Sequence, residues 1–491
     1  MTMQEESIVP ATSVSRALAR DRLGVLEIGS AIASSVAPLT VVALVVITAL
    51  AVTGLIGVPV AILAVAAILM VFAVGYMAMS RHIDNAGAFY AYVAQGLGRP
   101  LGVGTAWFAL FVYNSFQLCC YGGIGALAAL TSPLIRSSTG IAVAWWVFAF
   151  AAWAVVGLLG AHEVKLSGRI LMVLVILETV LVVAFTVAIM LTPGFHFSLD
   201  ALSVRNLWMP GVGTLIVLGM TAYAGIEQSV VYGEESKNRE RTIPRATYGT
   251  ILVVAAVYVF ASVVVISAGG PQIIGRASAE GSELFFTMSA VVLGQTALLV
   301  GKAALGSSLF AAAVSFHQAI ARYVFALGRE GVLPRTFGAT VKGGAPRNAS
   351  IVQTAFAFCV LATYAIAGWD PLVQLFYWGS TTGGLGILLL ITLTSAAVIV
   401  YFWRDSRGES LWHRRIAPLL ATVILLFVSV KALQSLPIQY AVEGGTGPAR
   451  AVPIALLVVF AAGTGWGVVL RFLNPPVYAG IGRGTRSATV L

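Results

Sequence analysis

Residues Thr221–Ala246 read TAYAGIEQSVVYGEESKNRERTIPRA, and the interpretation of the whole chain starts from this stretch. It begins in an apolar segment, passes Gly225 and Glu227, and ends in a dense cluster of charges before a proline. A carboxyl group inside an apolar segment of membrane-spanning length costs free energy unless the protein makes use of it. A neighbouring glycine favours a break in the helix, which frees backbone hydrogen-bonding groups. We therefore expect a functional interruption here.

The overall composition is that of an integral membrane protein. Hydrophobic residues make up 59% of the 491 residues and charged residues only 10%, against roughly 25% charged residues in a soluble domain. Because no polar linker divides the chain, we expect one polytopic domain at 24–473, preceded by a cytoplasmic segment at 1–23 and followed by a cytoplasmic tail at 474–491. The three cysteines, of which Cys119 and Cys120 are adjacent, imply no disulfide framework.

Twelve segments are long and apolar enough to cross a membrane, for which about 20 residues are needed. The third and the eighth are longer than a crossing requires, so we expect strong tilt or an attached surface helix there. The expected spans are 24–50, 55–79, 101–131, 140–160, 167–192, 209–235, 245–268, 286–326, 349–368, 371–402, 412–436 and 450–473.

The distribution of basic residues predicts the orientation. An even number of spans places both termini on one side. The N-terminal segment and the loops on its side hold 23 of the 29 Lys and Arg residues, the opposite side holds five, and Lys302 lies inside a span. Cytoplasmic loops carry such an excess, so we expect both termini in the cytoplasm and the chain in the cytoplasmic membrane. This distribution also accounts for the net charge of +10 without nucleic acid as a partner.

Enzyme motifs fail on inspection. The segment GQTALLVGKA from Gly294 has the wrong glycine spacing for a phosphate-binding loop, and HEVKL at His162 lacks the second histidine of a zinc protease helix. An intramembrane enzyme would need several facing His, Asp or Glu residues, and only Glu178 and Glu227 are available, with no adjacent histidine. We expect no catalytic residues, no cofactor and no metal site.

Four segments together resemble the amino acid–polyamine–organocation (APC) permeases. Their order and spacing match that family, and the resemblance covers about the first ten spans. The segments are IGSAIASSVAPLTVV (Ile28–Val42), NAGAFYAYVAQGLGRPLG (Asn85–Gly102), the Thr221–Ala246 stretch and SFHQAIARYVFALGREGVLPR (Ser315–Arg335).

This resemblance implies an all-α, LeuT-like fold in which helices 1–5 and 6–10 form two inverted repeats. Repeat one would cover about 24–192 and repeat two about 209–402, with helices 11 and 12, about 412–473, outside the repeats. Helices 1 and 6 would be discontinuous. The sequence supports this independently, because each has a small-residue or proline interruption near mid-span, around Ser34–Pro38 and Ala222–Glu227.

The resemblance also implies where a substrate binds. In the family, backbone groups of the broken helices hold the substrate's carboxylate and amino groups, and the N-terminal end of a half-helix suits a carboxylate. Helix 1 lacks the common Gly-Ser-Gly pattern here, so Pro38 must help to free its backbone; the alternative is a purely structural kink. By position, the substrate-binding residues would be Ser34, Ser35, Val36 and Ala37 in helix 1 and Tyr223, Ala224, Gly225 and Ile226 in helix 6.

Two carboxyl groups are candidates for coupling or gating. Glu227 matches a family glutamate near the site and its gate; the alternative is a structural hydrogen bond to a neighbouring helix. Glu178 lies where many proton-coupled relatives carry a lysine that replaces a sodium ion between helices 1, 5 and 8. It could bind a proton, counter Lys302 or face a cationic group of the substrate.

Helices 3 and 8 offer further polar residues, each with two interpretations. Asn114 and Gln117 share one face of helix 3 by their i, i+3 spacing. They either line the substrate site or hydrogen-bond a neighbouring helix. Ser307 and Ser308 could offer hydroxyl oxygens to an ion, although we favour close helix packing.

Aromatic and charged residues suggest gates. Tyr377 and Trp378 in helix 10 are candidates for an outer gate, or else belong to an interfacial aromatic belt. The clusters EESKNRERTIPR and GREGVLPR act as topology signals and helix caps, and their ion pairs could also close the inner mouth.

These features favour a secondary active transporter of amino acids or related amines that works by alternating access. We expect a proton rather than sodium as the coupling ion, import rather than exchange, and a monomer or a homodimer in the lipid membrane. Alternatives within the class are a polyamine or cationic amino-acid carrier and an amino-acid exchanger. Outside the class, a non-transporting nutrient sensor and an intramembrane enzyme remain as rivals.

Overall fold

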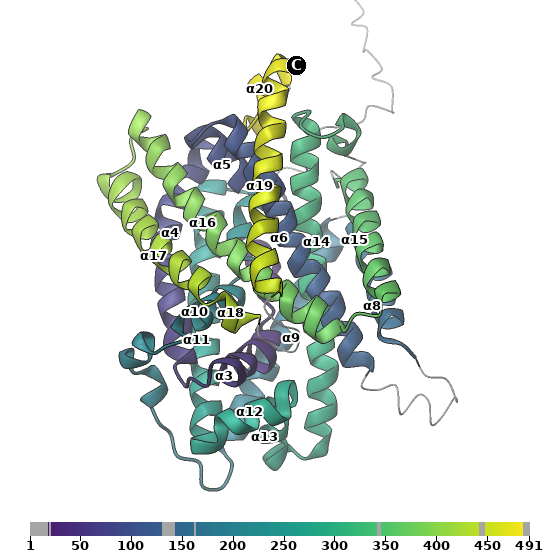
Figure 1. The fold of residues 1–491 in the computed structure, drawn as a ribbon, viewed down its shortest axis with the longest axis vertical. Coiled ribbons are helices and arrows are strands. Elements are labelled where there is room, and N and C mark those ends of the chain that lie inside the picture. The colour runs from purple at the N-terminus through teal and green to yellow at the C-terminus, as the bar shows by residue number, and fades with distance from the viewer. Residues whose placement is uncertain are drawn as a thin grey trace, which may run out of the picture.

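The protein is a bundle of helices. The computed structural model describes residues 18, 21–129, 143–161, 164–340, 345–440 and 447–484. In these ranges the only extended pairing is an isolated bridge between Leu23 and Ser236. The helices run mainly along the long axis of the molecule, so that the bundle has two ends (Figure 1).

Eleven helical segments within the described ranges are long and apolar enough to cross a membrane. The first five are Val25–Thr53 (α1 Val25–Val36, α2 Pro38–Thr40, a π-helical stretch Val41–Val46 and α3 Ile47–Thr53), Val58–His82 (α4), Arg99–Ala128 within α6 (Arg99–Ala129), Gly168–Met190 within α9 (Val164–Met190) and Val212–Glu235 (α10 Val212–Ala222 and the 3-10 helix η4 Ile226–Glu235). The other six are Arg239–Leu293 (α11 Arg239–Gly269, α12 Ile273–Glu280 and α13 Leu284–Leu293), Gln295–Arg329 (α14), Arg347–Ala367 (α15), Pro371–Arg404 (a π-helical turn Pro371–Tyr377 and α16 Trp378–Arg404), Trp412–Gln434 (a π-helical turn Trp412–Ile416 and α17 Ala417–Gln434) and Gly447–Leu473 (α19).

Shorter helices complete the described chain. α8 (Trp145–Ala161) lies at the position of the expected fourth span, and its 17 residues are fewer than the roughly 20 of a straight crossing. The residues on either side of it, 130–142 and 162–163, lie outside the described ranges. The remaining α-helices are α5 (Phe89–Gly96), α18 (Leu436–Gln439) and α20 (Pro475–Gly480).

The long eighth segment is divided in two. Gly294 has a φ of +77°, a conformation that favours glycine, and it ends α13 before α14 begins at Gln295. α13 packs on α9 through edge-to-face contacts of Phe185 with Phe285 and Phe286. The first part of the expected segment thus belongs to a separate short helix, and α14 alone still has 35 residues.

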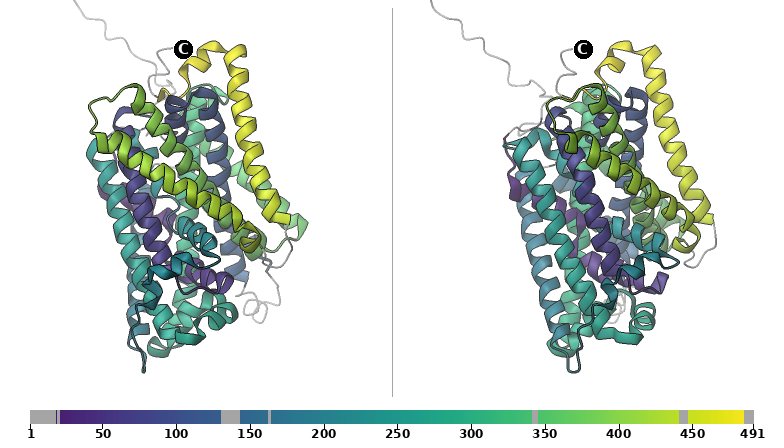
Figure 2. Two further views of the ribbon diagram at one scale, coloured as in Figure 1. Left: turned by 60° about the vertical axis from the view of Figure 1, so that its left-hand side comes forward. Right: turned by 90° about the vertical axis from the view of Figure 1, so that its left-hand side faces the viewer.

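Helices α17 and α19 lie at the periphery of the bundle (Figures 1 and 2). α19 approaches α6 closely, because a Cβ added at Gly104 would lie 2.2 Å from the hydroxyl of Thr464. α17 approaches α4 in the same manner, with Pro418 against Gly75. Small residues permit this close packing between membrane helices.

Many charged residues gather at one end of the bundle. One end carries Glu234, Arg239, Glu330 and Arg404 together with α5 and α20; we call it the charged end, and it is at the top of Figure 1. The opposite end carries α12 and α13 (Figure 1). The candidate site lies between the two ends.

Candidate functional site

The first interruption lies between α1 and α2. α1 ends at Val36, and Ala37 has a φ of +51°, which is a left-handed conformation. Pro38 has no N–H to donate to the Ser34 carbonyl four residues earlier, so the helix cannot continue without a break. The hydroxyl of Tyr258 in α11 donates to the Val36 carbonyl at 3.3 Å. The interruption thus lies in the expected interval Ser34–Pro38.

The second interruption lies between α10 and η4. α10 ends at Ala222, and Gly225 has a φ of +110°. The backbone N–H of Gly225 donates to Oε2 of Glu227 at 2.9 Å, so the carboxyl caps the turn that it follows. A 3-10 helix continues from Ile226 to Glu235. This break lies in the expected interval Ala222–Glu227.

The two interruptions contact each other. A Cβ added at Gly225 would lie 2.2 Å from the hydroxyl oxygen of Ser35, so only a glycine allows this approach. Ser35 donates to the Ile32 carbonyl at 2.8 Å, and Ser34 donates to the Leu171 carbonyl of α9 at 3.2 Å. The eight expected backbone residues of the two helices therefore form one buried region, since Ser34, Ser35, Val36, Ala37, Tyr223, Ala224, Gly225 and Ile226 are all buried.

Glu227 lies in an aromatic enclosure. The hydroxyl of Tyr76 donates to the Glu227 carbonyl at 3.1 Å. The hydroxyl of Tyr113 faces the Glu227 carboxyl closely enough to interact electrostatically. Neither Tyr113 Oη nor Glu227 Oε1 has a hydrogen-bond partner among the described residues. A cavity of about 20 Å³ adjoins the carboxyl, which is room for about one water molecule.

Glu178 belongs to a second polar cluster next to the helix 1 break. The hydroxyl of Ser308 in α14 donates to Oε2 of Glu178 in α9 at 2.9 Å. Thr40, two residues after Pro38, donates its hydroxyl to the same Ser308 oxygen at 2.8 Å. The side chains of Glu178, Ser308 and Thr40 thus connect α9, α14 and α2. Ser308 is a hydrogen-bonding residue here, in addition to the packing role that we favoured.

One hypothesis about Glu178 is wrong. Lys302 does not counter it, because Lys302 Nζ pairs with Glu283 Oε1 at 2.6 Å. Oε1 of Glu178 has no hydrogen-bond partner within the described chain. Ser307 donates to the Ala304 carbonyl of its own helix, so it stays apart from the cluster of Glu178, Ser308 and Thr40.

Asn114 and Gln117 face Gln353 of α15. Nε2 of Gln353 donates to Asn114 Oδ1 at 2.6 Å and to Gln117 Oε1 at 2.7 Å. Gln117 also contacts Tyr121 and Nδ1 of His317, at 2.8 and 3.1 Å. These contacts match the interhelical alternative, and Tyr113 is the residue of α6 that faces Glu227.

Tyr377 ends the π-helical turn before α16, and Trp378 is the first residue of α16. Tyr377 donates its hydroxyl to the Gln439 carbonyl of α18 at 2.8 Å. Trp378 lines an apolar recess of about 650 Å³ that Gln353 and Val452 also line. Tyr377 thus links the turn before α16 to α18, and the part of both residues in a gate remains a proposal.

Ion pairs join η4 to α14 at the charged end. Arg322 Nε donates to Glu235 Oε1 at 2.6 Å, and both side chains are only 1% exposed. Arg329 makes a two-pronged contact with Glu234, at 2.7 Å for each bond. The last turn of η4 is thereby fixed to α14. These are the two charged clusters that the sequence suggested for an inner gate.

A comparison with known protein families identifies the family of this chain. The family model described as "Amino acid permease" matches residues 23–462. The chain belongs to the amino acid permease family. The resemblance to APC permeases is therefore confirmed, and the permease is a multi-pass membrane protein.

Curated relatives of the permease have different substrates in their names. The low-affinity putrescine importer PlaP of Escherichia coli K12 is 23% identical over 369 residues, 69% of this chain and 72% of the importer. The branched-chain amino acid permease BcaP of Lactococcus lactis is 24% identical over 329 residues, 60% of this chain and 68% of the relative. The lysine-specific permease LysP of the same species is 27% identical over 250 residues, 47% and 49% of the two chains.

Sequence reasoning did not assign several residues that the structure brings to the permease's site. Tyr76 and Tyr113 face Glu227, and Thr40 completes the cluster of Glu178. A tyrosine in an apolar helix gives no signal of which way it faces. Thr40 offered a signal, because it follows Pro38 by two residues at the start of a half-helix.

Proposed function

We propose that the permease is a secondary active transporter that moves amino acids or related amines across the cytoplasmic membrane by alternating access. The observation that carries the proposal is the contact between two interrupted helices, Ser35 against Gly225, beside the buried Glu227. The names of its relatives, which include amino acid permeases and a putrescine importer, support the substrate class. The membrane potential would supply about 2.3 kcal/mol per charge per 100 mV.

The proposal includes twelve spans, with α8 as the fourth, arranged as two inverted repeats of five. Interruptions in α1–α2 and α10–η4, the first helices of the two halves, support this arrangement. The charged end would face the cytoplasm, because 23 of the 29 Lys and Arg residues fall on that side of the expected spans. Catalytic chemistry has no part in the proposal.

The proposed cycle opens the site to one side at a time. The cavity beside Glu227, of about 20 Å³, is too small for an amino acid, so substrate binding requires the helices around it to separate. The pairs of Glu235 with Arg322 and of Glu234 with Arg329 would close the cytoplasmic path and would have to break when it opens. Buried pairs hold such a state firmly, because separating them leaves charges unpaired.

Coupling to a proton is the finer part of the proposal. Glu178 and Glu227 each lie next to a helix break, and neither has a basic partner among the described residues. Each also has one carboxyl oxygen for which the described part of the chain provides no hydrogen-bond partner. Such groups are suited to exchange a proton as the site opens and closes. The alternative coupling ion is sodium, to which the hydroxyl oxygens of Ser308 and Thr40 would bind as ligands.

A second candidate is a carrier of diamines or cationic amino acids. Two buried carboxyl groups, which have no basic partner in the described ranges, could pair with the ammonium groups of such a substrate. The relative named as a putrescine importer is consistent with this candidate.

Uptake into proteoliposomes tests these proposals. The panel consists of labelled neutral, acidic and cationic amino acids and putrescine, under an inward proton gradient with and without sodium. Accumulation of one class that stops when the proton gradient is dissipated supports a proton-coupled transporter and identifies its substrate class. No accumulation and no counterflow exchange by folded protein would contradict the proposal and favour a sensor.

A further inference from the structure

A large polar cavity, which we call the basic vestibule, opens at the charged end. Its volume is about 1250 Å³. Seven Lys and Arg residues and four Asp and Glu residues line it. Three of these carboxylates, Asp84, Glu234 and Asp405, already pair with arginines. The vestibule therefore has an excess of positive charge that the described residues leave uncompensated.

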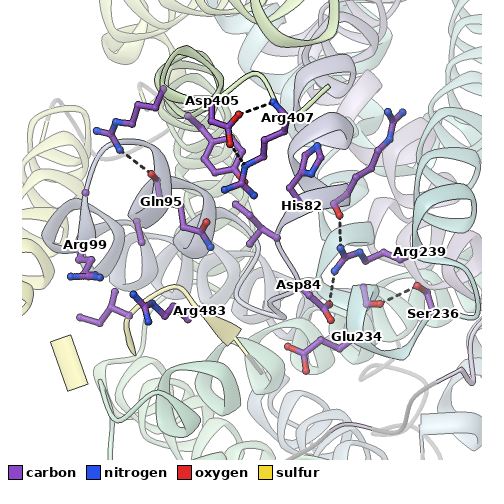
Figure 3. A pocket seen from close by; sticks show the side chains of 18 of the residues that line it. His82, Asp84, Gln95, Arg99, Glu234, Ser236, Arg239, Asp405, Arg407 and Arg483 are labelled. Atoms are coloured by element: carbon purple, nitrogen blue, oxygen red, sulfur yellow. Dashed lines mark hydrogen bonds and ion pairs between the residues drawn. The ribbon is translucent and has the colours of Figure 1, made fainter. Parts of the chain in front are cut away.

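Three arginines of the vestibule have no carboxylate within ion-pair distance in the described ranges: Arg99, Arg404 and Arg483. They come from the start of α6, the end of α16 and the segment after α20. Figure 3 shows Arg99 and Arg483 on the same side of the cavity as Gln95, while the pair of Asp84 and Arg239 lies on the other side. Two of the three unpaired arginines thus lie on one side of the vestibule.

Two of the three guanidinium groups, those of Arg404 and Arg99, are positioned by a contact that leaves donors free. Arg404 donates one bond, at 3.2 Å, to the Gln95 carbonyl. Arg99 lies over the ring of Tyr478, 5.1 Å from its centroid. A guanidinium carries five N–H donors, so most of them remain available.

Arg483 is positioned through its neighbours in the chain. The buried carboxylate of Glu330 accepts the backbone N–H of Gly482 at 2.7 Å and that of Gly484 at 2.8 Å. The residue between these two glycines is thereby fixed at the wall of the vestibule. A basic segment that served only as a topology signal would need no such anchoring.

We propose that the basic vestibule binds a phosphate-type oxyanion through Arg99, Arg404 and Arg483. Planar guanidinium groups bind phosphate through paired, charge-assisted hydrogen bonds, and they do so better than lysine. The phosphate comes either from a soluble phosphate ester or from the headgroup of an anionic phospholipid. Both have the same recognition chemistry, and the volume admits either.

The test uses full-length protein purified in a zwitterionic detergent or reconstituted in nanodiscs. In the first arm, inorganic pyrophosphate is titrated at constant ionic strength against chloride, and the unfolding temperature reports binding. In the second arm, native mass spectrometry measures the phosphatidylglycerol that the protein retains from mixed phosphatidylcholine nanodiscs. Neither readout involves transport, so the result is independent of the proposed function.

Charge-matched variants make the test specific. The vestibule variant is Arg99→Gln/Arg404→Gln/Arg483→Gln. The control is Arg335→Gln/Arg347→Gln/Arg471→Gln, which removes three exposed arginines that do not line the vestibule and form no ion pair within the described chain. If the triple vestibule variant is not monodisperse, the single variants Arg404→Gln and Arg483→Gln, both at exposed positions, replace it.

We expect saturable binding in one arm for the wild type and the control, and at least a tenfold loss in the vestibule variant. A response to pyrophosphate identifies a soluble phosphate, and retention of phosphatidylglycerol identifies a lipid headgroup. The proposal is overturned if the wild type responds in neither arm, or if the control variant loses binding as much as the vestibule variant does. Either result would mean that the three arginines serve only as a topology signal.

Discussion

Gly225 shows at the scale of one residue why the second break requires a glycine. Its φ of +110° strains any other residue, and an added Cβ would lie 2.2 Å from the Ser35 hydroxyl. We predict that Gly225→Ala lowers the free energy of unfolding by about 2 kcal/mol or more and abolishes uptake. Thermal unfolding and proteoliposome uptake measure the two effects.

The matched control for this substitution is Gly249→Ala. Gly249 lies within α11, and a Cβ there would meet nothing within 4 Å. Alanine in a helix interior is about 0.5–1 kcal/mol more favourable than glycine, so the control should retain or gain stability and keep its uptake. Equal behaviour of the two variants would show that the break does not depend on Gly225.

Glu227 is the second residue for which the structure permits a specific substitution. In Glu227→Gln, the amide oxygen can still accept the Gly225 N–H at the position of Oε2, so the fold should persist. Glutamine cannot exchange a proton, and we therefore predict the loss of gradient-driven uptake with an unfolding temperature close to that of the wild type. Wild-type uptake by this variant would refute the coupling role.

Tyr113→Phe removes the hydroxyl that faces the Glu227 carboxyl, and it should reduce uptake less than Glu227→Gln does.

At the scale of helices, the cluster of Glu178, Ser308 and Thr40 links α9, α14 and the segment after the first break. We predict that Glu178→Gln changes the pH profile of uptake or the preference for substrate charge, because the carboxyl can no longer bind or release a proton. Ser308→Ala is the companion variant: it keeps the carboxyl and removes its donor, so it should keep pH-dependent uptake at a lower rate. If Glu178→Gln changes neither property, Glu178 is a structural residue.

The junction of η4 and α14 is the second prediction at this scale. Arg322 and Glu235 are both almost fully buried, and removing one partner leaves an unpaired charge. We predict that Arg322→Met lowers the free energy of unfolding by roughly 3–5 kcal/mol. Glu283→Gln breaks the partly exposed pair with Lys302 and should cost less than about 1 kcal/mol. Thermal unfolding of both variants checks the contrast, and similar losses would contradict it.

The sequence predicted helices and their interruptions well because both depend on local chemistry. Pro38 lacks a donor and Gly225 tolerates a positive φ wherever they occur in a fold. The facing of polar side chains was harder to predict, since it depends on neighbours that are distant in sequence. Asn114 could line a site or hydrogen-bond a helix, and the bond that it accepts from Gln353 could not be predicted from the sequence.

The same limit applies to charges. Lys302 was a reasonable partner for Glu178 by composition, yet Glu283 pairs with it. Ser308 was interpreted as a packing residue, because a serine in a membrane helix gives no sign of the carboxyl that it meets. The sequence therefore does not predict which side chains of different helices contact each other, and the structure supplies this information.

At the scale of the whole molecule, Glu330 joins three segments that are far apart in the chain. Its carboxylate accepts hydrogen bonds from the amide of Asn85, the hydroxyl of Tyr90 and the backbone N–H groups of Gly482 and Gly484. Glu330 directly follows α14, whose last turns hold η4, so this carboxylate fixes the C-terminal segment to the charged end. The vestibule, the ion pairs beside η4 and the segment after α20 thus form one connected region.

This connection predicts a pH dependence of stability. Burial raises the pKa of the Glu330 carboxyl above its usual value of 4.5. The folded state then binds the proton more tightly than the unfolded state does. The free energy of unfolding should therefore rise as the pH falls from the raised pKa toward 4.5, and this contribution is lost as the pH rises through the folded pKa. Glu330→Gln lacks this contribution, and it also turns an amide donor toward the N–H groups, which costs about 1–3 kcal/mol.

Unfolding temperatures of the wild type and Glu330→Gln, measured between about pH 4.5 and pH 8, test this prediction. Asp405→Asn is the control, because the Asp405 side chain is 67% exposed and lies at the same end of the molecule. We expect the difference between the wild type and Glu330→Gln to widen toward low pH, and the difference for Asp405→Asn to stay constant. Parallel curves for all three proteins would mean that Glu330 is ionised throughout. Its four hydrogen bonds would then outweigh its burial, and the C-terminal segment would be held equally firmly at every pH in that range.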